Sequence, residues 1–448
     1  MNGPGSLPSI AERLLDLATA EGATQAEALV LGEDSALTRF ANSGIHQNVA
    51  HADVTLNLRV VIGRRIGVAR SNRLDPDSLA ALARDAAAIA RVQPEREDFV
   101  SLPSGGTVSG PRGGHSAATT GSSPESRADS VAAVICQADA AGVQAFGSCS
   151  VSTERLVVAN TLGIRADQAT TSAQLIVVCT GPGGESGYAE AVAVDVDAID
   201  PVAIGREAAT RAHAARSPRT IEPGEYPVVL DAYAVVDLVD QLGYLGFTGL
   251  AVEEGRSFFE PGKRIGSDLV TIVDDGSDPA GTPSAFDYEG VPKRPVTLVE
   301  RGVCREVVYD SQTAARAKRE STGHGLPAPN PWGPMPLNPI MSAGTATRDE
   351  LIGGVARGLL VTRFHYTNAV QPKLAIVTGM TRDGTFLIED GEVVGPVRNL
   401  RYTQSYLDAL AGVEAVGAER RLLRGFLGSV LVPAVRIGAF DFTGATEH

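Results

Sequence analysis

The chain has 448 residues, with 39 Lys and Arg against 53 Asp and Glu, which gives a formal net charge of −14 and a pI near 5.0. This acidic balance argues against a broad nucleic-acid surface, which needs clustered positive charge. No apolar run approaches the roughly 20 residues that span a bilayer, and the N-terminus has neither a basic start nor an apolar signal core. The four cysteines are scattered, so we predict reduced thiols and a cytoplasmic protein of two or three domains.

Residues 1–95 predict a small α/β domain. Ser9-x-x-Glu12 has the form of a capping box that opens a first helix. Asp75-Pro76 opens a second helix, because proline is tolerated in the first helical position. Strand patterns lie between the two helices at Ala26–Gly32, Ala36–Phe40 and Val54–Ile62.

Residues 96–125 are rich in Gly, Ser, Thr and Pro, a composition typical of a mobile linker or a long surface loop. Residues 126–220 predict a middle α+β domain, with one helix opening at Ser126 and another at Asp200-Pro201. The two Asp-Pro helices have similar sequences. This indicates either a duplicated half or convergence of Ala-rich amphipathic helices, and we favour convergence.

Residues 224–446 predict a large β-rich, barrel-like domain, so the fold class of the whole chain is α+β. Leu359–Tyr366 and Lys373–Met380 read as strands separated by Gln371-Pro372. Asp383-Gly384 and Asp390-Gly391 each lie between apolar runs and are predicted hairpin turns, because glycine tolerates positive φ. Polar residues along these strands form a charged fringe, which either binds a ligand or is a solvated face.

Several long motifs follow one another in the second half of the chain. They are RGLLVTRFHYT, TGMTRDGTFLIEDGEVVGPVRNLRYTQS, EEGRSF, LVTIVDDG, DYEGVPKRPVTLVERGV and ESTG. From about Tyr226 onward these motifs resemble the TldD/PmbA family, whose members were once described as modulators of DNA gyrase. The acidic charge gives that older description no support.

The resemblance implies where a zinc site would stand. A peptidase of this family is expected to carry H-E-x-x-x-H on a helix early in the C-terminal domain, with a late cysteine as a further ligand. Two neutral imidazoles would hold Zn²⁺ and the glutamate would take a proton from the metal-bound water. The comparable helix here is Asp231–Gly243, with Asp231 as its expected N-cap, and it places Val236, Asp237 and Gln241 at the three motif positions.

Neither ligand type is available near that helix. No histidine lies between His213 and His324, and no cysteine follows Cys304. We therefore predict no metal site, no cofactor and no catalytic residue on this chain. The remaining acidic residues of the helix, Asp237 and Asp240, are expected to be solvated carboxylates on its outer face.

Three other patterns are interpreted as structural. His46 and His51 have the spacing of a ligand pair, but Gln47 cannot act as a base and the surroundings read as strand and turn. The Gly-rich stretch 181–187 precedes a strand rather than a helix, so it is a turn and not a phosphate cradle. Asp274-Asp275-Gly276 is likewise expected to form a turn.

Residues 324–339 contain closely spaced prolines and the single tryptophan, Trp332, which favours an extended polyproline-like loop. The family resemblance implies that this loop contributes to a cleft and a partner surface, and a passive cover over the β domain is the alternative. The candidate contacts with substrate or partner are Trp332, Arg363, His365, Tyr366, Arg382 and Asp383. For the arginines, intradomain salt bridges are the competing interpretation.

The resemblance to a metal-free TldE/PmbA-type member implies a non-catalytic subunit of a heteromeric zinc metallopeptidase. Such a subunit would hold and gate a peptide for a zinc-bearing TldD-like partner. One alternative is a metal-independent enzyme acting on a small peptide-like metabolite, with acid–base chemistry through Asp383 and either His365 or Tyr366. The other is a homodimeric scaffold or regulator.

Overall fold

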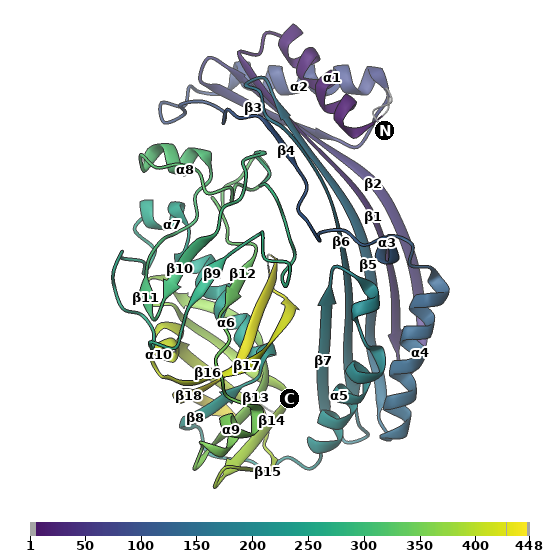
Figure 1. Cartoon of the computed structure of the whole chain (residues 1–448), viewed down its shortest axis with the longest axis vertical. Helices are drawn as coiled ribbons and strands as arrows, with labels where there is room; N and C mark the ends of the chain where they lie inside the picture. The colour runs from purple at the N-terminus through teal and green to yellow at the C-terminus, as the bar shows by residue number, and fades with distance from the viewer. Residues whose placement is uncertain (1–5, 427, 446–448) are drawn as a thin grey trace.

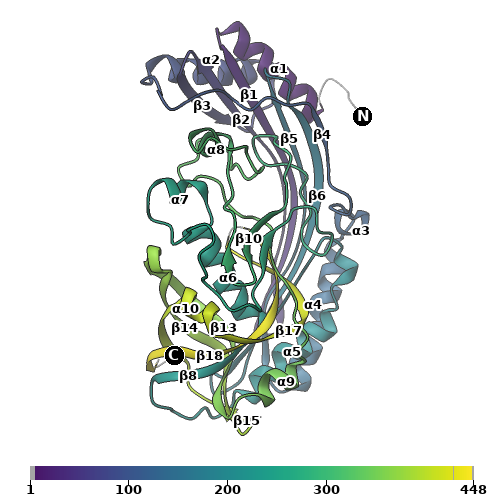
Figure 2. The ribbon, with the colours of Figure 1, turned by 60° about the vertical axis from the view of Figure 1, so that its left-hand side comes forward.

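The computed structural model describes residues 6–426 and 428–445, so residues 1–5, 427 and 446 of the predicted domains lie outside it. A long curved sheet built by the first half of the chain arches alongside the β-rich second half (Figures 1 and 2). In the described ranges, no helix is long and apolar enough to cross a membrane. The mixed α+β fold with a large β-rich C-terminal domain confirms the predicted fold class.

The first half of the chain forms one seven-stranded sheet, in the order β3-β2-β1-β5-β6-β4 with β7 on β6. Its elements are α1 Leu7–Ala20, β1 Gln25–Ala41, β2 Gly44–Ile62, β3 Arg65–Ser71, α2 Pro76–Val92, β4 Thr107–Ser109, α3 Ala117–Thr120, α4 Pro124–Ala140, β5 Gln144–Asn160, β6 Arg165–Thr180, β7 Ser186–Ala193, the 3₁₀ turn Val196–Ala198 and α5 Pro201–Ala214. Because β1 pairs with β5 along nearly its whole length, the segments 1–95 and 126–220 share this sheet.

The sheet consists of two similar units. Each unit runs helix, three antiparallel strands, helix: α1-β1-β2-β3-α2 and then α4-β5-β6-β7-α5. Gly67 on β3 and Gly187 on β7 each allow the backbone of the last helix of their unit to approach closely. The two Asp-Pro helices therefore occupy equivalent places, which favours the duplicated half over the convergence that the sequence led us to prefer.

Helix starts are set by capping side chains. Asp75 and Asp200 cap α2 and α5 as predicted, each accepting a hydrogen bond from the backbone N–H three residues later. The predicted starts at Ser9 and Ser126 are three residues late, since Ser6 and Ser123 are the actual N-caps. Both helices begin earlier because Pro8 and Pro124 fit the first turn, where proline is tolerated.

The segment 96–125 follows the edge of the sheet. Phe99 and Leu102 are buried, and the amide of Asn160 donates to the carbonyl of Pro103 at 2.7 Å. Strand β4 in this segment pairs in parallel with β6. These few apolar anchors fix a stretch whose composition shows no regular pattern.

The second half forms an eleven-stranded sheet. Its elements are β8 Gly224–Leu230, α6 Ala232–Gly246, α7 Gly249–Glu253, β9 Ile272–Asp274, β10 Val296–Glu300, β11 Val303–Cys304, α8 Ser311–Arg316, β12 Pro339–Met341, α9 Arg348–Gly353, β13 Arg357–Gln371, the 3₁₀ turn Pro372–Leu374, β14 Ile376–Glu389, β15 Glu392–Pro396, β16 Leu400–Ser405, α10 Tyr406–Ala411, β17 Val413–Arg424 and β18 Ser429–Ala445. Because β18 pairs with both β16 and β8, the strands β8, β13, β14, β16 and β18 close into a barrel-like ring.

One of the two predicted hairpin turns is wrong. Asp390-Gly391 does join β14 to β15, and both residues have positive φ. Asp383-Gly384, however, lies inside β14, where the register with β13 shifts between Val361 and Arg363. The pair therefore forms a bulge, which lets a long strand bend without ending.

The proline-rich loop 324–339 lies against the curved sheet. The carbonyl of Ala328 accepts hydrogen bonds from the Asn57 amide on β2 and the Arg70 guanidinium on β3. His324, at the start of the loop, is fully buried and its Nε2 lies 2.8 Å from Asp274. The loop thus connects the two halves of the molecule rather than covering the β domain alone.

Candidate functional site

Helix α6 is the first helix of the C-terminal domain, and it packs against β13 and β18 of the ring. Most of its residues are buried, so it is apolar on nearly every side. Asp231 stands at its N-cap position but makes no capping hydrogen bond, because its carboxylate pairs with Arg211 on α5. One side of α6 reaches a cavity of about 270 Å³.

This cavity, here called the α6 pocket, lies where the sheet, α6 and the β17–β18 turn meet. Val236, Asp237 and Gln241, the three positions predicted from the zinc motif, all line it. The other lining residues are Tyr188, Glu190, Tyr233, Asp240, Arg363, Phe364, Thr367, Leu423, Arg424, Gly425 and Phe426.

The two acidic residues of α6 are not the solvated carboxylates that the sequence predicted. Asp237 accepts a 2.6 Å hydrogen bond from the Tyr406 hydroxyl, and burial raises the pKa of its carboxyl to about 6. Asp240 accepts a 2.7 Å hydrogen bond from the backbone N–H of Phe426, and burial raises its pKa as well. Helical periodicity alone cannot show this, because both partners come from the far end of the chain.

A chain of hydroxyl groups leads away from Asp237. Tyr406 donates its single proton to Asp237, so its oxygen accepts from Tyr402 at 3.0 Å. The hydroxyls of Tyr402 and Thr367 lie 2.9 Å apart, and Thr367 also hydrogen-bonds the Asp237 carboxylate. Burial raises the pKa of both phenols, so they are neutral donors near neutral pH. Tyr406 and Thr367 are thus both hydrogen-bond partners of the Asp237 carboxylate.

Arg363 supplies positive charge at the pocket. Its guanidinium lies over the ring of Tyr188, 4.3 Å from the centroid, and its Nε donates to Asp383 at 2.6 Å. Asp383 is 2% exposed and its other oxygen accepts from Ser186 on β7 at 2.6 Å. The intradomain salt bridge considered for Arg363 is therefore formed, and it also binds the C-terminal domain to the sheet.

The other predicted contact residues lie outside the α6 pocket. His365 packs edge-to-face on Tyr366, and burial, together with Arg382 and Arg363, lowers the pKa of its imidazole. Tyr366 is 73% exposed, and the Arg382 side chain is exposed 4.0 Å from Asp383. Trp332 is exposed in the proline-rich loop, with its ring 6.1 Å from that of Tyr244.

Sequence reasoning missed the groups that the curved sheet contributes. Glu190 on β7 is buried and accepts hydrogen bonds from the Tyr188 hydroxyl, the Gln174 amide and the Arg424 backbone N–H. A charged residue within the strand SGYAEAVA was the available signal. Nothing in the sequence indicates that this strand faces helix α6.

The donor set of the α6 pocket does not fit zinc. Among the described residues that line it, none is a histidine or a cysteine, and the Val236 side chain offers no ligand atom. Across residues 6–426 and 428–445, no group of three or more His, Cys, Asp or Glu side chains is arranged to hold a metal ion. Asp237 and Asp240 are held by hydrogen-bond donors instead.

Three family models match successive parts of the chain. They are the PmbA/TldA metallopeptidase domain 1 at residues 26–90, the central domain at 119–216 and the C-terminal domain at 223–444. The fold and these matches define a metallopeptidase-related protein. The chain belongs to the PmbA/TldD family.

The fold is similar to the crystal structure of TldE from Thermococcus kodakarensis, with a TM-score of 0.87 at 21% identity over 97% of this chain and 100% of that one. A "Metalloprotease TldD homolog" of Buchnera aphidicola is 29% identical over 211 residues, 45% of this chain and 42% of the relative. A "Metalloprotease" of Methanothermobacter thermautotrophicus is 29% identical over 212 residues, 46% and 45% of the two chains. The matches thus span less than half the length of these curated relatives.

Proposed function

We propose that this chain is a TldE/PmbA-like, non-catalytic subunit of a heteromeric zinc metallopeptidase. The observation that carries the proposal is the set of residues that α6 presents to its pocket. Val236, Asp237 and Gln241 stand where the zinc-bearing members are expected to hold His, Glu and His. Since this set lacks the two histidine ligands of the motif, the metal is assigned to a TldD-like partner.

The named relatives support such a pair. The solved structure with a similar fold is called TldE, whereas the curated relatives are called TldD homolog or metalloprotease. In the proposed pair, the zinc-bearing chain cleaves the peptide and this chain presents it.

The proposed role of this chain is to hold an extended peptide and limit its access to the zinc of the partner. Extended peptides commonly bind by adding a strand to a sheet, which suits a β-rich domain. Arg363 lines the pocket, while Trp332, His365, Tyr366 and Arg382 are the proposed contacts on the surrounding surface. Asp383 holds Arg363 in place.

The test is peptide cleavage by a TldD-like partner reconstituted with and without this chain. Removal of the chain is expected to slow cleavage by at least about tenfold, because positioning of the substrate is lost. Gln241→Trp, which fills the α6 pocket, should slow it similarly, whereas Gln93→Trp at the exposed end of α2 should not. Unchanged zinc-dependent cleavage without the chain would refute the proposal.

A metal-independent enzyme is the second candidate, and one observation favours it. Asp237 has a pKa raised to about 6 and is hydrogen-bonded to a neutral tyrosine, an arrangement able to move a proton near neutral pH. The pair first considered for this role is not assembled, since the Asp383 carboxylate bonds Arg363 and Ser186. Turnover of a peptide-like compound by the metal-stripped chain alone, lost in Asp237→Asn, would support this candidate.

A further inference from the structure

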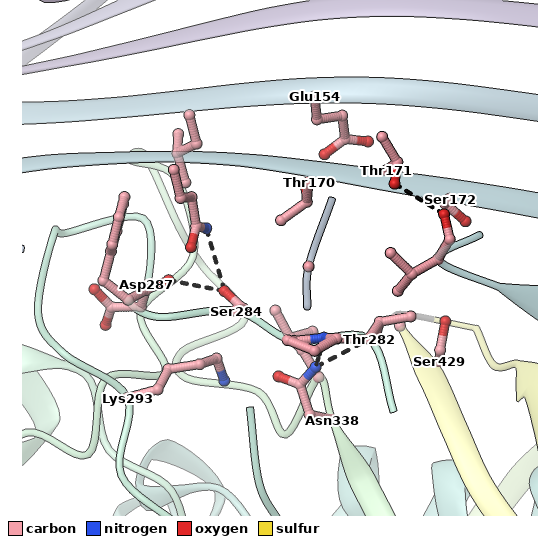
Figure 3. Close-up of a pocket in the computed structure, with 18 of the residues that line it drawn as sticks. Glu154, Thr170, Thr171, Ser172, Thr282, Ser284, Asp287, Lys293, Asn338 and Ser429 are labelled. Atoms are coloured by element: carbon pink, nitrogen blue, oxygen red, sulfur yellow. Dashed lines mark hydrogen bonds between the residues drawn. The ribbon is translucent and has the colours of Figure 1, made fainter. Parts of the chain in front are cut away.

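A second cavity, of about 210 Å³, lies between the curved sheet and the C-terminal domain (Figure 3). Strands β5 and β6 provide one wall through residues such as Glu154 and Thr170. Loops of the C-terminal domain provide the other wall, which includes Ser284, Lys293 and Asn338. We call it the Lys293 cavity.

Two polar groups in this cavity have no hydrogen-bond partner among the described atoms. The Lys293 side chain is 4% exposed, and its Nζ makes no hydrogen bond. The Oδ1 of Asn338, a residue 7% exposed, makes none either, although its Nδ2 donates to the Thr282 carbonyl at 2.8 Å. In Figure 3 the Lys293 ammonium and the Asn338 amide oxygen point toward each other. Burying an ammonium group with its donors unused is costly.

The nearest carboxylate forms an ion pair with Lys293 but accepts no hydrogen bond from it. Asp274 Oδ1 lies 3.6 Å from Lys293 Nζ, beyond hydrogen-bond distance, and 2.8 Å from His324 Nε2. Its Oδ2 accepts the backbone N–H of Asn338 at 2.8 Å. Burial opposes ionisation, but Lys293 and His324 still lower the Asp274 pKa to about 2. Asp274 therefore fixes both Lys293 and Asn338 at the edge of the cavity, while Lys293 Nζ and Asn338 Oδ1 have no hydrogen-bond partner among the described atoms.

The size and walls of the cavity limit what it can hold. A volume of about 210 Å³ exceeds the ~30 Å³ share of one water molecule and falls below the ~300 Å³ of pockets for drug-sized ligands. Leu31, Leu156 and Phe286 supply apolar surface beside the polar groups. A small molecule with an anionic end, a donor group and an aliphatic part matches this combination.

We propose that the Lys293 cavity binds an amino-acid-like ligand. Its carboxylate would accept hydrogen bonds from Lys293, its N–H would donate to Asn338 Oδ1, and its side chain would pack on Leu31 and Phe286. A free amino acid and the C-terminal residue of a peptide share this chemistry. The proposal stands apart from the accessory-subunit role, because it concerns a different cavity.

The test is calorimetric titration of the full chain with L-leucine, N-acetyl-L-leucine and N-acetyl-L-leucinamide. At least one of the two acids is expected to bind, and the amide to bind at least about tenfold more weakly, because it cannot accept the charged hydrogen bond. Binding of leucine alone identifies a free amino acid as the source. Binding of N-acetyl-leucine alone identifies a peptide terminus, and binding of both supports the shared chemistry.

A variant pair tests the role of the ammonium group. Lys293→Met should weaken binding of the acids by about tenfold or more, whereas Lys373→Met, at an exposed position, should leave it unchanged. The comparison of acid with amide uses the unaltered chain, so it holds even if Lys293→Met fails to fold. The proposal is overturned if neither acid binds, if acid and amide bind equally, or if a folded Lys293→Met variant binds like the unaltered chain.

Discussion

The Asp237 carboxyl shows how position changes the chemistry of a residue. It occupies the place expected for the catalytic glutamate of a zinc-bearing relative, yet its partner is a phenol rather than a metal-bound water. The hydroxyl chain through Tyr406, Tyr402 and Thr367 holds that partner in place. Burial raises the Asp237 pKa from its ordinary 3.8 to about 6, so folding is penalised where this carboxyl is ionised.

We predict that Asp237→Asn becomes relatively more stable as pH rises. Because the pKa of Asp237 is raised in the folded protein, the native state holds a proton that the unfolded chain has released, and the penalty grows from about pH 4 to above pH 6. Between pH 4 and pH 8 the stability difference should shift toward the variant by up to about 3 kcal/mol. Urea unfolding at several pH values measures this.

Asp16→Asn, at an exposed position on α1, is the matched control and should show no such trend. A difference between Asp237→Asn and the unaltered chain that stays constant across the same pH range would contradict the assigned environment of Asp237.

For single residues, the sequence shows which side chains helix α6 carries, but it does not show how deeply they are buried. The absence of histidines from α6 can be read directly, and the structure places Val236, Asp237 and Gln241 together at one pocket. The burial of Asp237 and Asp240 could not be predicted, because their partners Tyr406 and Phe426 lie 169 and 186 residues away along the chain.

Among the elements, β14 shows how a turn signal can be overridden. Asp-Gly between apolar runs is a strong local signal for a hairpin. Here the Asp383 side chain bonds Arg363 and Ser186, and the backbone of the pair adopts positive φ within a continuous strand. Tertiary contacts convert the turn into a bulge, whereas Asp390-Gly391, which joins β14 to β15, remains a turn.

Gly384→Ala should therefore destabilise the protein. Gly384 has φ +117°, and an added Cβ would lie 2.8 Å from Thr362 Oγ1 and from the Phe386 ring. We expect a loss of about 2–3 kcal/mol in the free energy of unfolding. Gly353→Ala in α9, where an added Cβ meets nothing within 4 Å, should be neutral or slightly stabilising. Equal melting temperatures of the two variants would argue against the bulge.

In the whole molecule, the curved sheet and the C-terminal domain are joined by buried charges. Arg59 on β2 pairs with Glu27 on β1 at 2.6 Å and with Glu289 of the C-terminal domain at 3.3 Å. Burial raises the pKa of Glu27 although Arg59 opposes the shift. The sequence predicted the order of the elements and the β-rich ring. It could not predict this contact, or that β1 and β5 would merge two segments into one sheet.

Arg59→Met should loosen the contact between the two halves. Removing the guanidinium leaves two buried carboxylates without a cation, which is expected to cost about 3–5 kcal/mol. The loss should be greater at pH 8 than at pH 5, because the carboxyls can take up protons at the lower pH. Denaturant unfolding and limited proteolysis measure it. Arg65→Met, which removes an exposed pair with Glu95, should change stability by less than about 0.5 kcal/mol, and equal effects of the two variants would contradict the prediction.

The most direct test of the central claim is the zinc content of the purified chain, alone and in complex with a TldD-like partner. Because the α6 pocket lacks a zinc donor set, we predict no bound zinc in the isolated chain and zinc in a complex that cleaves peptides. Stoichiometric zinc in the isolated chain would contradict the account and would show that this chain holds the metal itself.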